Sequence, residues 1–455
     1  MDGSIGSPHW RRNLVVCLLG SFTTIVAMTM LLPYLPLYVE RLGAEGHASI
    51  VRWSGVAYAA TFLTAALTAP LWGRLGDRFG RKPMLVRASL GMAVAMALTG
   101  LAQSVEQLVL LRLLTGLLGG YASGSTILVA AQTPREHSAW ALGVLSIGVM
   151  AGSVVGPLIG GVAPVLVGVR ASFLVAGGVI FLAFLATAFG IREDRPGRGA
   201  PRADGVASAD GAVAARGGGV TTASFDAPGD GGAPVRGTGA GGATIDERVA
   251  SHPWGPRHAR VVVLLATASL LMFATMSLEP IVTVYVGELA PGTPHVAALS
   301  GVVMAVGALG SIASAPRLGR LADRVGHARV ITGALVGAAA MLALQAAAQE
   351  VWQLVVLRFG AGVFLGGLLP SITAAIRHAV PDRVVGRVLG LSVSAQFVGQ
   401  VLGPVLGGVV AGALGMRAVF VMTASVLLAG ALLSRVGAQD GGGATARVGV
   451  PSAGA

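Results

Sequence analysis

Long apolar segments recur along almost the whole chain, and they constrain its fold more than any other feature. About twelve of them reach the roughly 20 residues that a helix needs to cross a bilayer. Charged or turn-forming residues separate one segment from the next. An outer-membrane barrel would instead show alternating segments of about ten residues. The segments therefore predict an all-α integral membrane protein with twelve transmembrane helices.

Composition agrees with this prediction. Only 11% of the 455 residues are charged and 54% are hydrophobic, whereas a soluble domain carries about 25% charged residues. The single cysteine, Cys17, has no partner for a disulfide and cannot form a thiolate metal site. Arg11 and Arg12 precede a first apolar segment that is too long for a signal-peptide core, so we expect it to remain as the first helix.

A net charge of +12 could indicate a nucleic-acid partner, but the distribution of the basic residues argues against one. Most of them lie in the connections on one side of the predicted bundle. The connections on the other side contain only Arg41, Arg52, Arg170 and Arg417. Cytoplasmic loops are enriched in Lys and Arg, so we expect both chain termini to lie in the cytoplasm. The charge then reflects contact with the bilayer, and no nucleic acid is expected.

The chain repeats itself on either side of a polar segment. Gly73, Asp77 and Arg112 match Gly319, Asp323 and Arg358 at a constant displacement. Six spans on each side place the two halves in the same orientation, related by an axis along the membrane normal. The polar segment is rich in Gly, Ala and Pro and cannot bury enough surface to order itself. We therefore expect a six-helix half at 1–191, a disordered cytoplasmic linker at 192–259, a six-helix half at 260–435 and a disordered tail at 436–455.

Signals for an enzyme are missing. The eight histidines show no HExxH pattern and no spacing typical of a metal site, and no phosphate-binding GxxxxGK[ST] occurs. We therefore expect no catalytic residues, no metal and no cofactor. Transport driven by an ion gradient fits a chain of this class better than transport driven by ATP.

Three motifs resemble those of a known family. The stretch "GRLGDRFGRK" at 73–82 is similar to the loop signature of the major facilitator superfamily. Arg112 and Gly116 resemble its fourth-helix motif, and "GSVVGPLIGG" at 152–161 resembles its fifth-helix antiporter motif. Together with "LPYLPLYVERLG" and "GMRAVF", these stretches are similar to the MdtG-type multidrug efflux proteins of that superfamily. The resemblance covers both halves and leaves out the linker and the tail.

The loop signature contains an acid that topology does not explain. The resemblance implies that Asp77 contacts the N-terminus of the eleventh helix, and that Asp323 contacts that of the fifth, when the cytoplasmic side is closed. Unpaired backbone N–H groups and a partial positive charge make a helix N-terminus favourable for a carboxylate. The alternative is a solvated loop whose bases only set topology. The residues of this predicted conformational latch are Gly73, Asp77, Arg78, Gly80, Arg81, Lys82, Gly319, Asp323 and Arg324.

Three charged residues within the spans are candidates for proton coupling. Arg112 and Arg358 lie in the outer half of the bilayer, where an arginine must face a cavity, pair with another group or extend to the surface. Glu279 lies inside the seventh helix, and its counterpart in the repeat is Leu32, so symmetry does not require an acid there. A buried carboxyl group can alternate between protonated and charged forms. The alternative for Glu279 is a position near the outer helix end, in contact with water.

Glycines recur every four residues in the fifth and eleventh helices. Such stripes let helices pack closely in lipid, and the prolines that follow bend the helix. Packing is the direct interpretation, and the resemblance adds antiporter character. The residues of this predicted glycine motif are Gly152, Gly156, Pro157, Gly160, Gly161, Gly399, Gly403, Pro404, Gly407 and Gly408.

A central cavity should form between helices one, two, four and five and helices seven, eight, ten and eleven. Methionine and aromatic side chains suit varied ligands because they repack, although they are equally common in membrane interiors. Intramembrane glutamines could line the path or join helices by hydrogen bonds. The candidates for the cavity wall are Met28, Tyr58, Phe62, Met150, Phe273, Met304, Gln396, Phe397 and Gln400.

The resemblance implies a proton-coupled multidrug efflux transporter that works by alternating access as a monomer in the bacterial inner membrane. Its partners would be amphipathic drugs, protons and the lipid bilayer. A facilitator or symporter for a single metabolite is the first alternative. A receptor or scaffold that does not transport is the second, and deleting residues 199–243 would abolish its activity while leaving an exporter active.

Overall fold

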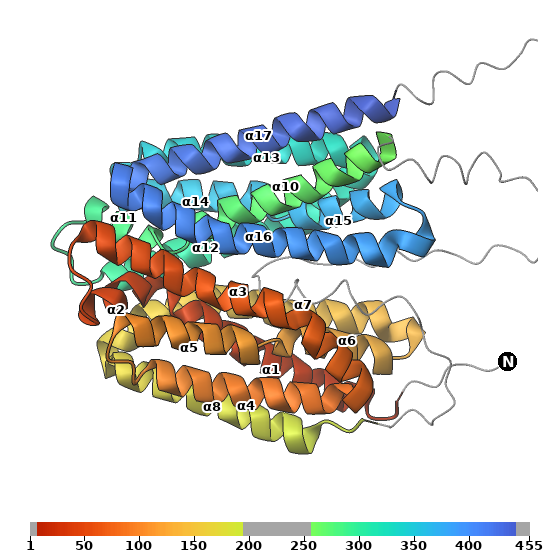
Figure 1. Ribbon diagram of the computed structural model, residues 1–455, viewed down its shortest axis with the longest axis horizontal. Helices are drawn as coiled ribbons and strands as arrows, with labels where there is room; N and C mark the ends of the chain where they lie inside the picture. The colour runs from red at the N-terminus through yellow and green to blue at the C-terminus, as the bar shows by residue number, and fades with distance from the viewer. Residues whose placement is uncertain (1–6, 194–255, 443–455) are drawn as a thin grey trace, which may run out of the picture.

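All regular elements in the described part of the chain are helices, which confirms the predicted all-α fold (Figure 1). The computed structural model describes residues 7–193 and 256–442. The predicted linker and tail lie largely outside these residues. Two boundaries differ from the expectation, because the seventh span begins earlier, at Pro256, and the last helix continues past Arg435 to Gly442.

The helices before the undescribed segment form the N-half of the molecule. They are α1 (Trp10–Met30), η1 (Leu32–Tyr34), α2 (Leu35–Arg41), α3 (His47–Phe79), α4 (Arg81–Thr99), α5 (Val105–Leu118), α6 (Tyr121–Gln132), α7 (Arg135–Val167) and α8 (Val169–Gly190). The helices after it form the C-half. They are α10 (Pro256–Leu278), α11 (Val282–Leu289), α12 (Val296–Val325), α13 (His327–Ala346), α14 (Val351–Leu365), α15 (Leu368–Ala379), α16 (Asp382–Leu414) and α17 (Met416–Gly442).

Each predicted span falls on one of these helices or on two or three consecutive ones. In the described residues, eleven such stretches are long and apolar enough to cross a membrane. The remaining span corresponds to α4, whose first two turns contain Arg81, Lys82 and Arg87 and lower its mean hydropathy. Because α4 packs lengthwise against α8, it crosses the molecule with the others.

Four spans are interrupted, and the sequence explains where. Pro33 and Pro36 lie where α1 gives way to η1 and α2, and Pro280 lies between α10 and α11, because proline cannot donate a helical hydrogen bond. Glycine pairs separate α5 from α6 and α14 from α15. Irregular backbone at membrane depth is tolerated only where protein or a cavity surrounds it. Each break is therefore expected to lie against other helices or against a cavity.

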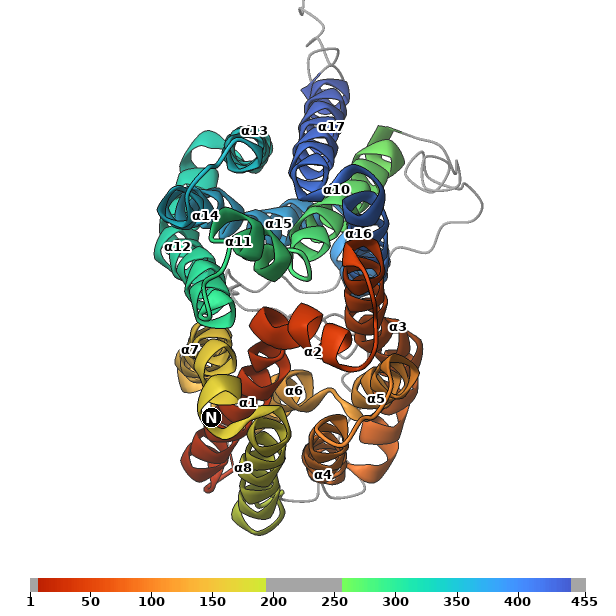
Figure 2. The ribbon, with the colours of Figure 1, turned by 90° about the vertical axis from the view of Figure 1, so that its left-hand side faces the viewer.

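The helix bundle has two ends, a terminal end and a distal end. The terminal end is where α1 begins and α17 ends, and it lies on the right in Figure 1. The distal end is opposite and contains the connection from α2 to α3. Figure 2 shows the two halves meeting along two pairs of helices, α3 with α16 and α7 with α12, which are also the closest pairings across the halves.

Candidate functional site

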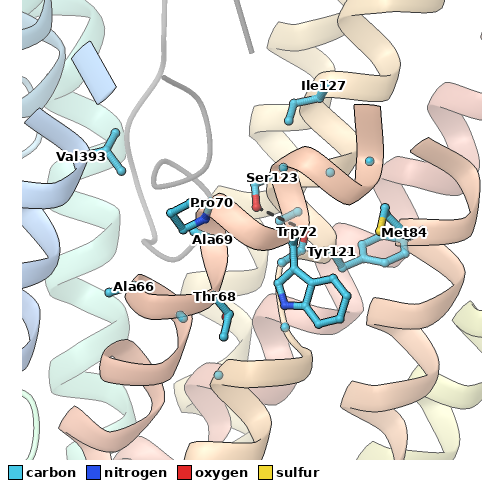
Figure 3. Close-up of a pocket in the computed structure, with 18 of the residues that line it drawn as sticks. Ala66, Thr68, Ala69, Pro70, Trp72, Met84, Tyr121, Ser123, Ile127 and Val393 are labelled. Atoms are coloured by element: carbon cyan, nitrogen blue, oxygen red, sulfur yellow. Dashed lines mark hydrogen bonds between the residues drawn. The ribbon is translucent and has the colours of Figure 1, made fainter. Parts of the chain in front are cut away.

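A cavity of about 490 Å³ lies between the halves at the terminal end. This volume suits a drug-sized ligand. It extends from Thr24 and Met28 of α1 along α3 to Asp77, close to where α3 ends. The C-half contributes one helix, α16, through Gly390, Val393, Ser394 and Phe397. Figure 3 shows Val393 facing the cavity from one side and Trp72 and Met84 on the opposite side.

The break in the fourth span forms part of this wall. Gly120 has φ of +100°, which glycine adopts readily, and the break leaves the last carbonyl groups of α5 without helical partners. Trp72 Nε1 donates to the carbonyl of Leu117 at 2.9 Å, and Arg87 Nη2 donates to that of Gly119 at 3.1 Å. The Arg87 guanidinium lies 3.5 Å from the centroid of the Trp72 ring. Side chains from α3 and α4 therefore stabilise the break.

The sequence patterns did not single out Trp72, Met84 or Arg87. Arg87 lies within the third span, so the cost of a charge inside the membrane, which singled out Arg112, applies to it as well. Of the nine predicted wall residues, Met28, Phe62 and Phe397 line the cavity. Tyr58, Met150, Phe273, Met304, Gln396 and Gln400 are not among the residues that line it. The predicted set of helices also changes in this conformation, because α4 takes part and the fifth, seventh, eighth and tenth spans do not.

The halves are in contact at the distal end. The Thr283 hydroxyl of the C-half donates to the carbonyl of Pro33 at 3.1 Å, and His47 Nε2 lies 3.6 Å from Glu288 Oε1. The Tyr58 hydroxyl reaches Met276 Sδ at 3.7 Å. These contacts lie on the far side of Phe62 from the cavity opening. The structure is therefore closed at the distal end and open at the terminal end.

The predicted glycine motif divides into two sets of contacts. Gly152, Gly156 and Gly160 face α1, and a Cβ atom at Gly156 would overlap the Thr29 hydroxyl. Gly399, Gly403 and Gly407 face α10 in the same way. The stripe itself is therefore packing within each half.

The remaining glycines of the motif face the other half. A Cβ atom at Gly161 would lie 2.6 Å from the carbonyl oxygen of Ala297, and one at Gly408 would lie 2.7 Å from that of Val51. Gly55 and Gly301 pack against the carbonyl groups of Pro404 and Pro157. These four glycines form the distal contact, a name we keep for Gly55, Gly161, Gly301 and Gly408.

The proton-coupling candidates Glu279 and Arg358 lie together. Glu279 sits at the break between α10 and α11, and its Oε1 lies 3.4 Å from Arg358 Nη2 of α14. Both side chains are largely buried, at 17% and 10% exposure, so neither is bathed in water at a helix end. Arg112 is 2% exposed and its Nε has no hydrogen-bond partner in the described residues. None of the three lines the cavity.

Of the nine predicted latch residues, Gly73, Asp77 and Arg81 line the cavity. Gly80 and Gly326 have φ of +95° and +96° and form the turns into α4 and α13. Gly73 and Gly319 lie inside helices with open space beside them, so they do not form the turns. Asp77 is exposed and makes no hydrogen bond or ion pair with the described residues, whereas Asp323 Oδ1 lies 3.8 Å from His327 Nε2.

The described ranges 7–193 and 256–442 contain no group of three or more His, Cys, Asp or Glu residues that could hold a metal ion.

Comparison with known proteins identifies the family. The model of the Major Facilitator Superfamily matches residues 17–316 and 292–438. A protein of Dickeya zeae named multidrug resistance protein MdtG is 39% identical over 93% of this chain and 94% of its own length. The protein of the same name from Salmonella arizonae is 38% identical over 94% of this chain and 95% of its own length.

Solved structures agree in fold. A bacterial homologue of the human lysosomal transporter Spinster, in an inward-facing and occupied conformation, has a TM-score of 0.70 at 15% identity. That comparison covers 95% of this chain and 98% of the other. The human organic anion transporter MFSD10 has a TM-score of 0.60 at 18% identity, covering 94% of this chain and all of the other. With both halves matched in sequence and in fold, the chain belongs to the Major Facilitator Superfamily.

Proposed function

We propose that this chain is a multidrug efflux transporter that exports amphipathic compounds in exchange for protons. The observation that carries the proposal is the cavity of about 490 Å³ between the two halves, open at the terminal end and closed at the distal end. A site with access from one side at a time is what alternating access requires. The printed name of the relatives, multidrug resistance protein, supplies the substrate class.

In this proposal the protein lies in the bacterial inner membrane with both termini in the cytoplasm. The structure then represents the inward-facing state, in which the cavity receives compounds from the cytoplasm or the inner leaflet. Apolar and aromatic side chains such as Met28, Phe62 and Phe397 accept the apolar part of a ligand. The protein works as a monomer.

Glu279 is the proposed proton-binding group. Its carboxylate is held by Arg358 in a largely buried pair. Protonation would remove the charge that attracts Arg358, and so would release the break between α10 and α11 from α14. Arg112 occupies the matching place in the N-half, where Leu32 stands in place of the acid. We therefore assign proton binding to the C-half, and drug binding mainly to the part of the cavity wall that the N-half forms.

The decisive experiment measures proton release from inverted membrane vesicles when candidate drugs are added. Drugs should collapse a pre-formed pH gradient with the wild-type protein and fail to do so with Glu279→Gln. Glu106→Gln is the matched control, because Glu106 is an exposed acid in the first turn of α5 at the distal end. No response from the wild-type protein across chemically varied drugs would reject multidrug antiport and favour a transporter for a single metabolite.

The latch is tested separately with Asp77→Asn. Asp77 is unpaired among the described residues of the terminal-open state, so the substitution should cost that state nothing. It should weaken the terminal-closed state, in which the carboxylate would meet the N-terminus of α16. We expect more terminal-open protein and roughly two- to fivefold slower export, since a charge at a helix end contributes about 0.3–1 kcal/mol. Distances between spin labels at positions 79 and 387 measure the populations, and equal populations in both proteins would refute the latch.

A further inference from the structure

The chain leaves α8 through a short strap, residues 191–193, that is tied to the terminal end of the N-half. Ile191 is fully buried. Both backbone groups of Arg192 bond to the Asn13 side chain of α1, with the Arg192 N–H donating to Oδ1 at 3.1 Å and Asn13 Nδ2 donating to the Arg192 carbonyl at 2.8 Å. Asn13 Nδ2 also lies 2.6 Å from Gln132 Oε1 of α6. The position of Glu193 is thus set by three helices.

Glu193 uses this position to occupy the N-terminus of α4. Its Oε1 accepts the backbone N–H of Arg81 and its Oε2 accepts that of Lys82, each at 2.9 Å. The first turn of a helix has N–H groups without helical partners and a partial positive charge. The basic side chains of Arg81 and Lys82 add to that charge. Glu193 therefore satisfies two of the unpaired N–H groups at the start of α4.

Asp77 is the other acid beside this helix start. It lies in the last turn of α3, and the turn at Gly80 brings it close along the chain to Arg81. Even so, Asp77 makes no hydrogen bond or ion pair with α4, and Arg81 Nη1 donates to the carbonyl of Ile127 at 2.9 Å. Asp77 lines the cavity instead.

The C-half provides an internal comparison. Asp323 matches Asp77, and His327 matches Arg81. None of the described side chains places a carboxylate on the first N–H groups of α13. There, the carboxylate of Asp323 turns toward the start of the following helix and lies 3.8 Å from His327 Nε2. In the C-half, therefore, the matching acid lies beside the side chain of the first residue of the next helix.

We propose that Glu193 is a positioning residue for Asp77. By occupying the N-terminus of α4, Glu193 prevents Asp77 from capping that helix and keeps its carboxylate free for the N-terminus of α16 in the other half. The two acids thereby serve two helix ends, one within the N-half and one across the halves. This inference rests on the latch in the proposed function, and its first test is independent of transport.

The first test measures the accessibility of the Asp77 carboxylate in the full-length protein. A water-soluble carbodiimide with glycine ethyl ester labels free carboxylates, and mass spectrometry gives the rate at position 77. Glu193→Ala should slow labelling of Asp77 at least threefold, because Asp77 then bonds to the N–H groups of Arg81 and Lys82. Glu193→Gln retains one acceptor oxygen and should have a smaller effect. An unchanged rate at Asp77 in Glu193→Ala would overturn the proposal.

The second test measures conformational populations with spin labels at positions 79 and 387. Glu193→Ala should favour the terminal-open state about as strongly as Asp77→Asn, and the double variant should match either single variant, because both remove the same contact. Additive effects would show that Glu193 acts independently of Asp77 and would overturn the proposal. Glu106→Gln controls for loss of an acid in the first turn of a helix.

The two tests also separate this inference from the proposed function. Slower labelling of Asp77 together with unchanged populations would uphold the positioning role of Glu193 and refute the latch. Glu193→Ala could fail to yield folded protein. In that case Glu193→Gln replaces it, because glutamine keeps the shape of the side chain and removes its charge. Labelling of Asp77 and the conformational populations should then change in the same directions as expected for Glu193→Ala.

Discussion

Replacing Gly408 with valine should hold the two halves apart at the distal end. A Cβ atom there would lie 2.7 Å from the carbonyl oxygen of Val51 and 3.2 Å from Arg52 Cα, and backbone atoms cannot move aside as a flexible side chain can. Overpacking of this kind costs about 1–3 kcal/mol. Since about 1.4 kcal/mol is a factor of ten, the distal-closed state should lose roughly tenfold or more in population. Gly161→Val should act in the same way from the other pair of helices.

Spin labels at positions 45 and 295, both exposed at the distal end, measure this opening. Labelling is selective because the natural Cys17 is fully buried. Gly178→Val is the matched control, since Gly178 lies in α8 and a Cβ atom there would meet nothing within 4 Å. Export should fall with Gly408→Val and remain with Gly178→Val. Distances equal to wild type in Gly408→Val would mean that the distal contact does not govern closure.

Gly156→Val provides a contrast within the same motif. Its side chain would overlap the Thr29 hydroxyl inside the N-half and not the other half. This variant should unfold at a lower temperature without a selective change in distal distance. The difference between Gly156 and Gly408 follows from which helix each glycine faces.

Separating Glu279 from Arg358 should destabilise the C-half strongly. Removing one partner of a largely buried pair leaves an uncompensated charge and costs on the order of 3 kcal/mol. Glu279→Leu, which introduces the residue that the N-half has at the matching position, and Arg358→Met should each lower the melting temperature of the purified protein. The double variant should recover most of the loss, because an apolar pair of similar volume replaces the ion pair.

A measurement of proton release distinguishes the effect of these variants on stability from their effect on proton coupling. The double variant should fold and bind drugs and still release no protons, since it lacks the proposed proton-binding carboxyl group. Additive losses of melting temperature would contradict an energetic link between Glu279 and Arg358. Full proton release from the double variant would remove Glu279 from the coupling mechanism.

Local patterns predicted the helices well because hydropathy and turn chemistry act within a span. The breaks at Pro33, at Pro280 and at the pair Gly119 and Gly120 were not predicted as breaks, although proline and glycine are the residues that allow them. The boundaries near Pro256 and Gly442 were missed because polar helix ends resemble the polar segments beyond them.

The site was harder to predict because its members come from distant parts of the chain. Glu279 and Arg358 were both singled out, yet nothing in the sequence pairs residues 79 positions apart. Glu193 went unnoticed because it lies within the polar segment, residues 192–259, that was predicted to be a disordered linker. Arg87 went unnoticed because it lies close to a loop whose bases were assigned to the membrane surface.

By itself, the sequence determined the membrane-spanning class, the order of the helices, the repeat and the asymmetry of charge, since each depends on which residues are neighbours along one span. Only the tertiary structure decided that Gly161 and Gly408 meet the other half, that Glu279 meets Arg358 and that Glu193, not Asp77, occupies the start of α4. The physical reason is that these contacts depend on how separate helices pack. Two conformations of an alternating transporter share one hydropathy profile, so the choice between an open terminal end and an open distal end lies in packing alone.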